Sequence, residues 1–164
     1  MAIGVRAAWR LALLSAASTA CARNHCPHAL AERVSDPRTT RRLVNQGRDT
    51  VDLTIADLST ECVAGLWPRV RSSKIDREWR YLMHAAAAVG AEVRGPDAAG
   101  GLLPPDDVII RFEARADDGS LVGASEAQVA IPPGRSGSQQ IRGVMELTED
   151  QIRRLRTVEV HWKG

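Results

Sequence analysis

The sequence predicts an all-β sandwich with one short helix near its C-terminal end. Short runs of residues alternate apolar and polar side chains, which is typical of strands that bury one face. Turn signals separate these runs, and a helix-start motif occurs near the C-terminus. Short strands joined by turns, with one small helical crossover, favour two packed sheets. The chain has 164 residues, a length that fits one domain.

The first clear strand is predicted in residues 50–57. Val51, Leu53 and Ile55 alternate with polar residues, so their side chains share one face of the strand. Leu58 breaks this alternation, and we therefore expect a bulge or the end of the strand near Asp57.

Residues 79–93 fit either a strand or a helix. Four consecutive alanines, residues 85–88, have the highest intrinsic helix propensity. The same region also fits a strand that is buried on both faces. We favour the strand, because a sandwich needs a central strand here. Residues 63–78, which precede it, contain Gly65 and Pro68 and are expected to be less regular.

The next strands form a predicted hairpin. Ile110, Phe112 and Ala114 alternate with charged residues, and Asp118-Gly119 follows as a turn signal. Glycine accepts the positive φ that such a turn requires. The return strand is expected within residues 121–131, where small residues predominate.

A helix and a final strand complete the fold. Thr148 and Gln151 have the spacing of a capping box, which predicts a helix over residues 149–155. Three arginines near its end are expected to form a solvated face. Residues 157–162 then alternate as a strand. The apolar residues expected on its buried face are Val158, Val160 and Trp162.

The composition is that of an ordinary globular protein and excludes some functions. Hydrophobic residues make up 44% and charged residues 26% of the chain, and the formal net charge is +2. A field this weak gives no reason to expect nucleic-acid binding. We find neither a Walker loop nor a GxGxxG motif, and a lone histidine such as His84 does not specify a reaction. The sequence therefore predicts no catalytic residue, no cofactor and no enzyme activity.

Residues 1–20 are predicted to be a signal peptide. They carry Arg6 and Arg10, then a short apolar run, and they contain no acidic residue. A basic region, an apolar run and small residues at a cleavage site are the three parts of a secretory signal. The uncharged stretch 11–22 has 12 residues, whereas a transmembrane helix needs about 20.

The small residues before Cys21 resemble a bacterial lipobox, in which the cysteine is lipidated and becomes the mature N-terminus. A lipobox usually has leucine three residues before the cysteine, and this chain has Ser18. Two alternatives stay open: ordinary signal-peptidase cleavage after Ala20 or Ala22, and an organellar transit peptide. Lipidation would leave residues 21–47 as an N-terminal tether, with a helical turn possible near residue 30. Residues 48–164 would form the sandwich domain.

The chain has three cysteines, Cys21, Cys26 and Cys62. An odd number in an exported protein needs an explanation. If Cys21 takes the lipid, Cys26 and Cys62 remain as a pair, and an oxidising compartment permits them to form a disulfide. Such a bond stabilises a fold by roughly 4 kcal/mol in the chain-entropy model. The alternative is a cytosolic protein with two reduced thiols.

A metal site is a competing interpretation of the same segment. His25, Cys26 and His28 lie close together, and both residue types bind zinc or copper. A fourth ligand would have to come from His84 or His161. A metal at this cluster would exclude the disulfide, because both need the sulfur of Cys26.

Several short motifs resemble those of a known group of proteins. They are CPHAL at Cys26, GRD at Gly47, VDLTIADLSTEC ending at Cys62, RGP at Arg94 and the DG turn at Asp118. In this order they resemble uncharacterised alphaproteobacterial lipoproteins. The resemblance implies an immunoglobulin-like sandwich of about seven strands, and it carries no activity. Trp162 stands where the resemblance leads us to expect Phe.

The sequence supports two hypotheses for the function. The first is a non-catalytic binding or structural module of the bacterial cell envelope, lipid-anchored at Cys21 and facing the periplasm. Its partners would be the membrane and an envelope protein, and secretion to the periplasm is the alternative location. The second hypothesis is a small secreted enzyme or metal-binding protein that uses His25, Cys26 and His28. The metal content of the purified protein distinguishes the two.

Overall fold

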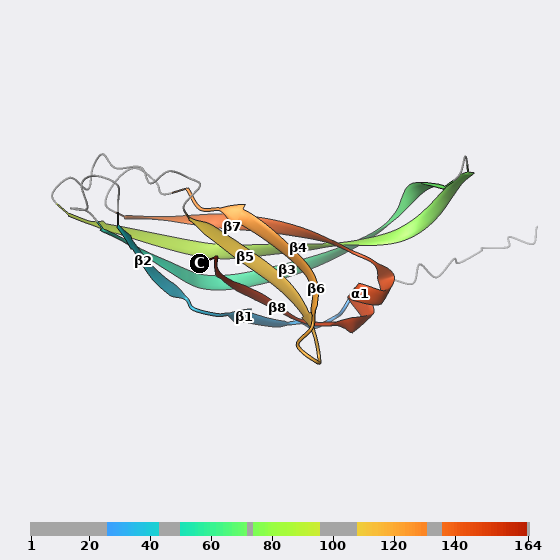
Figure 1. The fold of residues 1–164 in the computed structure, drawn as a ribbon, viewed down its shortest axis with the longest axis horizontal. Helices are drawn as coiled ribbons and strands as arrows, with labels where there is room; N and C mark the ends of the chain where they lie inside the picture. Colours follow the sequence, from blue (N-terminus) through green and yellow to red (C-terminus); the bar gives the residue numbers. More distant parts are fainter. Residues whose placement is uncertain (1–25, 43–49, 72–73, 96–107, 131–135, 164) are drawn as a thin grey trace, which may run out of the picture.

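The computed structural model describes residues 26–42, 50–71, 74–95, 108–130 and 136–163 (Figure 1). The predicted signal peptide and Cys21 lie outside these residues. Within them the fold is the all-β sandwich that the sequence predicts, with eight strands and one short helix. In chain order the elements are β1 (Ala31–Val34), β2 (Arg38–Arg42), β3 (Thr50–Arg71), β4 (Lys74–Arg94), β5 (Ile109–Ala116), β6 (Leu121–Gln128), β7 (Ser136–Leu147), α1 (Glu149–Arg154) and β8 (Leu155–Trp162).

The strands form two four-stranded sheets. The first sheet has the order β1-β8-β5-β6, and the second has the order β2-β3-β4-β7. All neighbouring strands are antiparallel except β1 and β8, which are parallel. Figure 1 shows that the strands of one sheet run obliquely across those of the other.

The described part of the segment predicted as a tether, residues 26–42, contains two strands of the sandwich. β1 is an edge strand of the first sheet and β2 is an edge strand of the second. The helical turn considered near residue 30 is wrong, because Ala31–Val34 is β1 and pairs with Thr157–Val160 of β8. Most side chains of β1 are exposed, so the apolar pattern that marks a strand is missing from its sequence.

The core lies between the two sheets and uses the residues that the alternation predicts. Val51 and Leu53 of β3, Phe112 of β5 and Val158 and Val160 of β8 are all fully buried. The predicted meeting of the three clearest strands in one core is confirmed.

β4 confirms the prediction of a strand for residues 79–93. Tyr81, Met83, Ala85, Ala87 and Val89 alternate along it and are buried on its inner face. The remaining alanines of the run face outward. Helix propensity is a weak preference, and the pairing of β4 with β3 and β7 overrides it.

The local signals for a bulge and for a helix start are both confirmed. The β3–β4 register shifts between Ile55 and Asp57, and the Asp57 carboxylate accepts a hydrogen bond from the backbone N–H of Leu58 at 2.9 Å. At α1, the Thr148 hydroxyl accepts from the Gln151 N–H, and the Gln151 side chain accepts from the Thr148 N–H. These two bonds are the predicted capping box.

The hairpin turn between β5 and β6 is also confirmed. Gly119 has a φ of +76°, in the region that glycine occupies without strain. The Asp118 side chain accepts a hydrogen bond from the Ser120 N–H at 2.9 Å.

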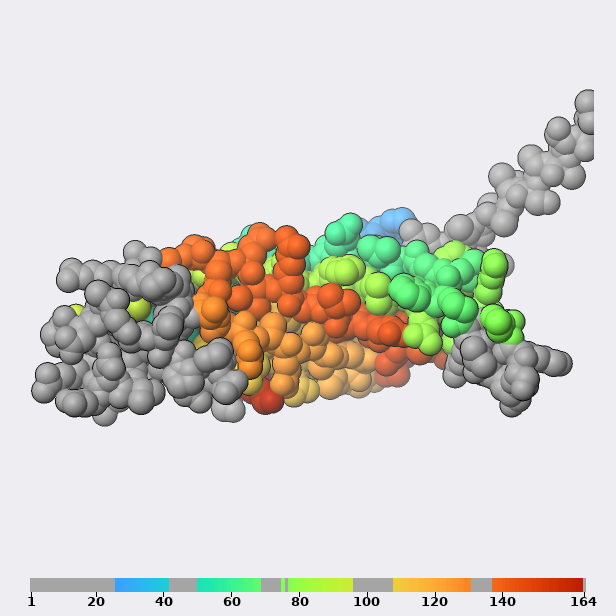
Figure 2. All heavy atoms as spheres, turned by 90° about the horizontal axis from the view of Figure 1, so that it is seen from above, coloured from blue at the N-terminus to red at the C-terminus, as the bar shows by residue number. Residues whose placement is uncertain are grey.

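The prediction that residues 63–78 are irregular is wrong. In the described part of this range β3 and β4 continue as the paired strands of a long hairpin, whereas β7 ends at Leu147, opposite Tyr81. Among the described residues, Gly65–Arg71 and Lys74–Arg80 therefore pair only with each other. We call these two segments the arm. Each has seven residues, so the arm is about 23 Å long, and Figures 1 and 2 show it projecting at one end of the molecule.

The two residues that made this region look irregular both fit the arm. Pro68 lies in β3 opposite Arg77. Both strands of the arm are edges, and proline is tolerated in edge strands because its missing N–H need not pair. At Gly65 the Trp67 ring lies close to where a Cβ would be, with Nε1 at 3.1 Å from that position.

Candidate functional site

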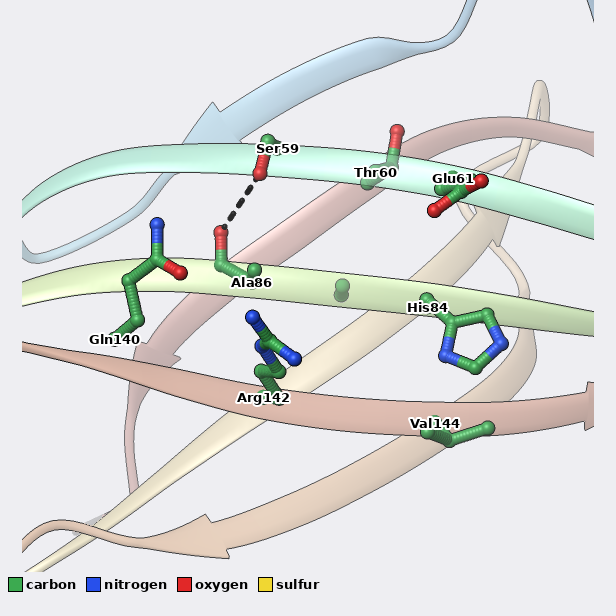
Figure 3. Close-up of a pocket in the computed structure, with 9 residues that line it drawn as sticks. Ser59, Thr60, Glu61, His84, Ala86, Gln140, Arg142 and Val144 are labelled. Carbon is green, nitrogen blue, oxygen red and sulfur yellow. Dashed lines mark hydrogen bonds between the residues drawn. The ribbon is translucent and has the colours of Figure 1, made fainter.

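The outer face of the second sheet carries a shallow groove of about 350 Å³ (Figure 3). It follows β4 between β3 and β7. The register places Ser59, Ala86 and Arg142 side by side across the three strands, and Glu61, His84 and Val144 form the next row. The lining residues are Ser59, Thr60, Glu61, His84, Ala85, Ala86, Gln140, Arg142 and Val144.

The groove exists because a small residue lies between larger ones. Ala86 forms part of its floor in β4, while Gln140 and Arg142 of β7 rise beside it (Figure 3). The run of alanines that suggested a helix is thus the cause of this depression. No single stretch of the sequence predicts it, because its three strands lie far apart in the chain.

The polar side chains of the groove are not arranged as a nucleophile and its base. The Ser59 hydroxyl donates to the backbone carbonyl of Ala86 at 3.4 Å. Within the described ranges, no hydrogen bond joins Ser59, Glu61 or His84 to one another. A nucleophile needs a base within about 2.6–3.2 Å. The groove instead offers one guanidinium, one carboxylate and one imidazole to a polar ligand.

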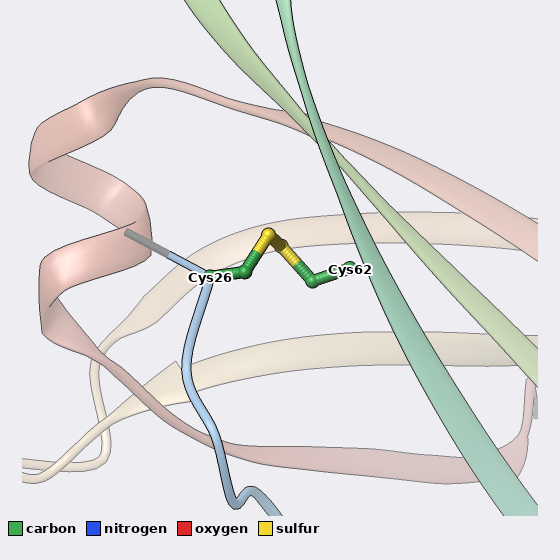
Figure 4. Close-up of a disulfide and its surroundings, with 2 residues drawn as sticks. All are labelled: Cys26 and Cys62. Atoms are coloured by element: carbon green, nitrogen blue, oxygen red, sulfur yellow. A yellow bond between two sulfur atoms is a disulfide. The ribbon is translucent and has the colours of Figure 1, made fainter. Parts of the chain in front are cut away.

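The disulfide between Cys26 and Cys62 is present, as predicted (Figure 4). The two Cα atoms are 5.7 Å apart, a usual distance for bonded cysteines. The bond joins the segment that leads into β1 to β3, close to the base of the arm. Both cysteines are partly buried against the core. A hydrogen bond from Thr60 to the Glu32 carboxylate, at 2.7 Å, reinforces the same junction.

The proposed metal ligands that lie within the described residues are not brought together. The sulfur of Cys26 is part of the disulfide, and His25 lies outside the described residues. His28 is exposed. His84 lies on the outer face of the second sheet, whereas His161 contacts Glu113 on the outer face of the first. In the part of the chain that the structure describes, no group of three or more His, Cys, Asp or Glu residues is placed to hold a metal ion.

The outer face of the first sheet carries a network of ion pairs. Glu113 of β5 is buried and pairs with both Arg111, at 2.9 Å, and Arg115. Arg115 continues to Glu159 of β8 at 3.2 Å, and Arg111 continues to Glu126 of β6 at 3.4 Å. Because the network crosses three strands, it ties them together and has a structural role.

The arginines at the end of α1 have partners on the surface. Arg153 pairs with Glu149, and Arg154 donates to the Ser120 hydroxyl at 2.8 Å. Arg156 pairs with Asp117 at 3.2 Å. These contacts fit the solvated face that the sequence predicts.

The arm carries a group of exposed apolar side chains that the sequence did not predict. Leu66, Trp67 and Ile75 project from it into solvent. The signal was present, since two partly apolar runs flank the polar pair Ser72-Ser73. Such a pair between two strands is compatible with a hairpin, but Gly65 and Pro68 obscured it.

No protein-family model matches this chain, and comparisons with curated proteins and with solved structures found no match. The resemblance to alphaproteobacterial lipoproteins and the immunoglobulin-like topology therefore stay predictions. The function has to be inferred from the chain's own residues.

Proposed function

We propose that this protein is a non-catalytic binding or structural module of the bacterial cell envelope, lipid-anchored at Cys21 and facing the periplasm. The observation that carries the proposal is the Cys26–Cys62 disulfide. It accounts for two of the three cysteines and leaves Cys21, directly after the signal-like leader, as the third. Disulfides persist in oxidising compartments such as the periplasm, which supports export.

The same bond supports a short anchor. Cys21 precedes Cys26 by five residues, and five residues span at most about 18 Å when fully extended. A lipid on Cys21 would therefore hold β3, through Cys62, close to the membrane. In the described residues no helix is both long and apolar enough to cross a bilayer.

A binding role fits the surfaces better than catalysis does. The groove on the second sheet places Glu61, His84 and Arg142 near one another without a nucleophile–base pair. The metal-binding alternative needs the sulfur of Cys26 as a ligand, and that sulfur is bonded to Cys62. An envelope protein is the partner class that we propose for the groove.

Mass spectrometry of the mature N-terminus tests the proposal. We expect the wild-type protein, purified from membranes, to begin at Cys21 and to carry the mass of acyl chains. Cys21→Ser should abolish that modification, and Cys62→Ser should retain it. An intact Met1, or a mature chain that begins at Arg23, would contradict lipid anchoring.

A further inference from the structure

The arm concentrates the exposed apolar side chains of the described fold. Six large apolar side chains are exposed in the described residues, and four of them lie in the arm or at its base. Leu66, Trp67 and Ile75 are 51%, 46% and 76% exposed. Soluble proteins usually scatter such residues singly, and a cluster marks an interaction site.

The cluster arises because one sheet is longer than the other. Leu66 lies opposite Trp79, and the next pair on the same face is Ala64 and Tyr81. Tyr81 is fully buried in the core. Ile75 shares this face by its place in the alternation of β4. The core-facing side of the second sheet thus continues into the arm, where the first sheet no longer covers it.

The arm also has an apolar group on its opposite face. Trp67 alternates with Leu66, and its ring lies close to Gly65. A partner that receives the end of the arm therefore has to accept apolar side chains from both faces. The headgroup region of a bilayer surrounds an inserted ribbon in this way, whereas a flat protein surface contacts one face.

The arm is more basic than the rest of the chain. Without Arg6 and Arg10 of the leader, the 22 basic residues become 20, equal to the 20 acidic ones. The arm has five basic and two acidic residues, so the remaining mature chain is formally acidic. These residues are Arg69, Arg71, Lys74, Arg77, Arg80, Asp76 and Glu78. This excess of positive charge opposes pairing between the arms of two copies and favours an anionic partner.

We propose that the arm binds the surface of an anionic phospholipid membrane, with Leu66, Trp67 and Ile75 entering the headgroup region. Tryptophan is favoured at the membrane–water interface because its ring is apolar and its N–H is polar. Arginine and lysine near the surface are attracted to anionic lipids. The proposal gains from the proposed anchor, because Cys26 is bonded to Cys62 at the base of the arm. The membrane would then hold the sandwich at two neighbouring points.

Vesicle binding by a chain without acyl groups tests the arm separately from the anchor. The full chain with Cys21→Ser is mixed with vesicles of phosphatidylethanolamine and phosphatidylglycerol, and the bound fraction is measured by co-sedimentation. In this background we expect Leu66→Ser and Ile75→Ser each to lower the partition coefficient about tenfold. Binding to phosphatidylcholine vesicles should be weaker for the parent chain, because these vesicles have no net charge.

Leu121→Ser is the matched control, since Leu121 is 47% exposed but lies on β6 of the first sheet and is not part of the arm. It should leave binding unchanged. All the chains compared share one N-terminus, so any contribution of the leader cancels. Equal binding by the Leu66→Ser and Leu121→Ser chains would overturn the proposal. The proposal would also be overturned if Leu66→Ser left vesicle binding unchanged but abolished either self-association of the chain or its binding to an envelope protein. The arm would then be a protein-binding site. The wild-type N-terminal mass decides the anchor independently.

Discussion

The ring of Phe112, in β5, packs directly against the backbone of Gly143, in β7 of the opposite sheet. A Cβ atom on Gly143 would lie 2.5 Å from Cδ2 and 2.9 Å from Cε2 of that ring. Phe112 is fully buried, and the atoms that would clash belong to a rigid ring. The two sheets therefore approach so closely here that only glycine, whose side chain is a hydrogen atom, fits at position 143 without a shift of the ring.

We expect Gly143→Ala to lower the free energy of unfolding by about 1–3 kcal/mol, the usual cost of overpacking a core. Gly90→Ala, in β4 of the same sheet, is the control, because its nearest non-local atom would be 3.9 Å away. Urea denaturation of the two variants measures the difference. Equal stabilities would show that the close approach of Phe112 does not constrain position 143.

The buried carboxylate of Glu113 predicts a second difference in stability. It accepts a hydrogen bond from Arg115 and forms an ion pair with Arg111, and Glu113→Gln removes the charge that both arginines face. Hydrogen bonds to charged groups contribute roughly 1.5–3 kcal/mol, so we expect a loss of that size. Glu146→Gln is the control. The Glu146 pair with Arg80 is largely exposed, and such pairs contribute less than about 1 kcal/mol. Thermal unfolding that ranks Glu146→Gln as the more damaging change would contradict the network.

The carboxyl group of Glu126 gives a prediction for pH. The hydrogen bond from Lys163 lowers its pKa, and the charges of Lys163 and Arg111 add to this effect. A folded-state pKa below the unfolded one contributes stability above the unfolded pKa, and this stability is lost as the pH falls through the folded pKa. We expect Lys163→Gln to raise the pKa of Glu126 toward its ordinary value, as measured by NMR titration. Arg142→Gln, on the other sheet, should leave it unchanged, and the same shift in both variants would argue against the contact.

Local signals in the sequence predicted those parts of the fold that depend on neighbouring residues. The capping box at Thr148, the turn at Gly119 and the bulge at Asp57 each need only a few consecutive residues. The strand at residues 79–93 needed one further step. The helix propensity of the four alanines favours a helix, and only the expectation that a sandwich has a central strand here favoured the strand.

The remaining features depend on contacts that are distant in sequence. β2 is the polar stretch RTTRR and becomes a strand because β3 offers it an edge. The groove needs three strands from residues 59–144. The arm was not predicted because proline and glycine usually weaken a strand. Only the pairing with β4 shows that Gly65 and Pro68 lie in a strand that has a single neighbour, where a proline is tolerated.

The Cys26–Cys62 bond leads to the last prediction. Residues 26–42 contribute only two short edge strands, and most side chains of β1 are exposed. Burial therefore holds this segment weakly, and the disulfide adds a covalent constraint to the strand pairing of β1 with β8 and of β2 with β3. We expect Cys26→Ser/Cys62→Ser to lower the free energy of unfolding by at most about 4 kcal/mol. Hydrogen exchange should show the β1 amides losing protection before those of β5 and β8. Cys21→Ser, which leaves the bond intact, should change neither measurement. A uniform loss of protection across the sandwich would instead mean that the disulfide supports the whole core.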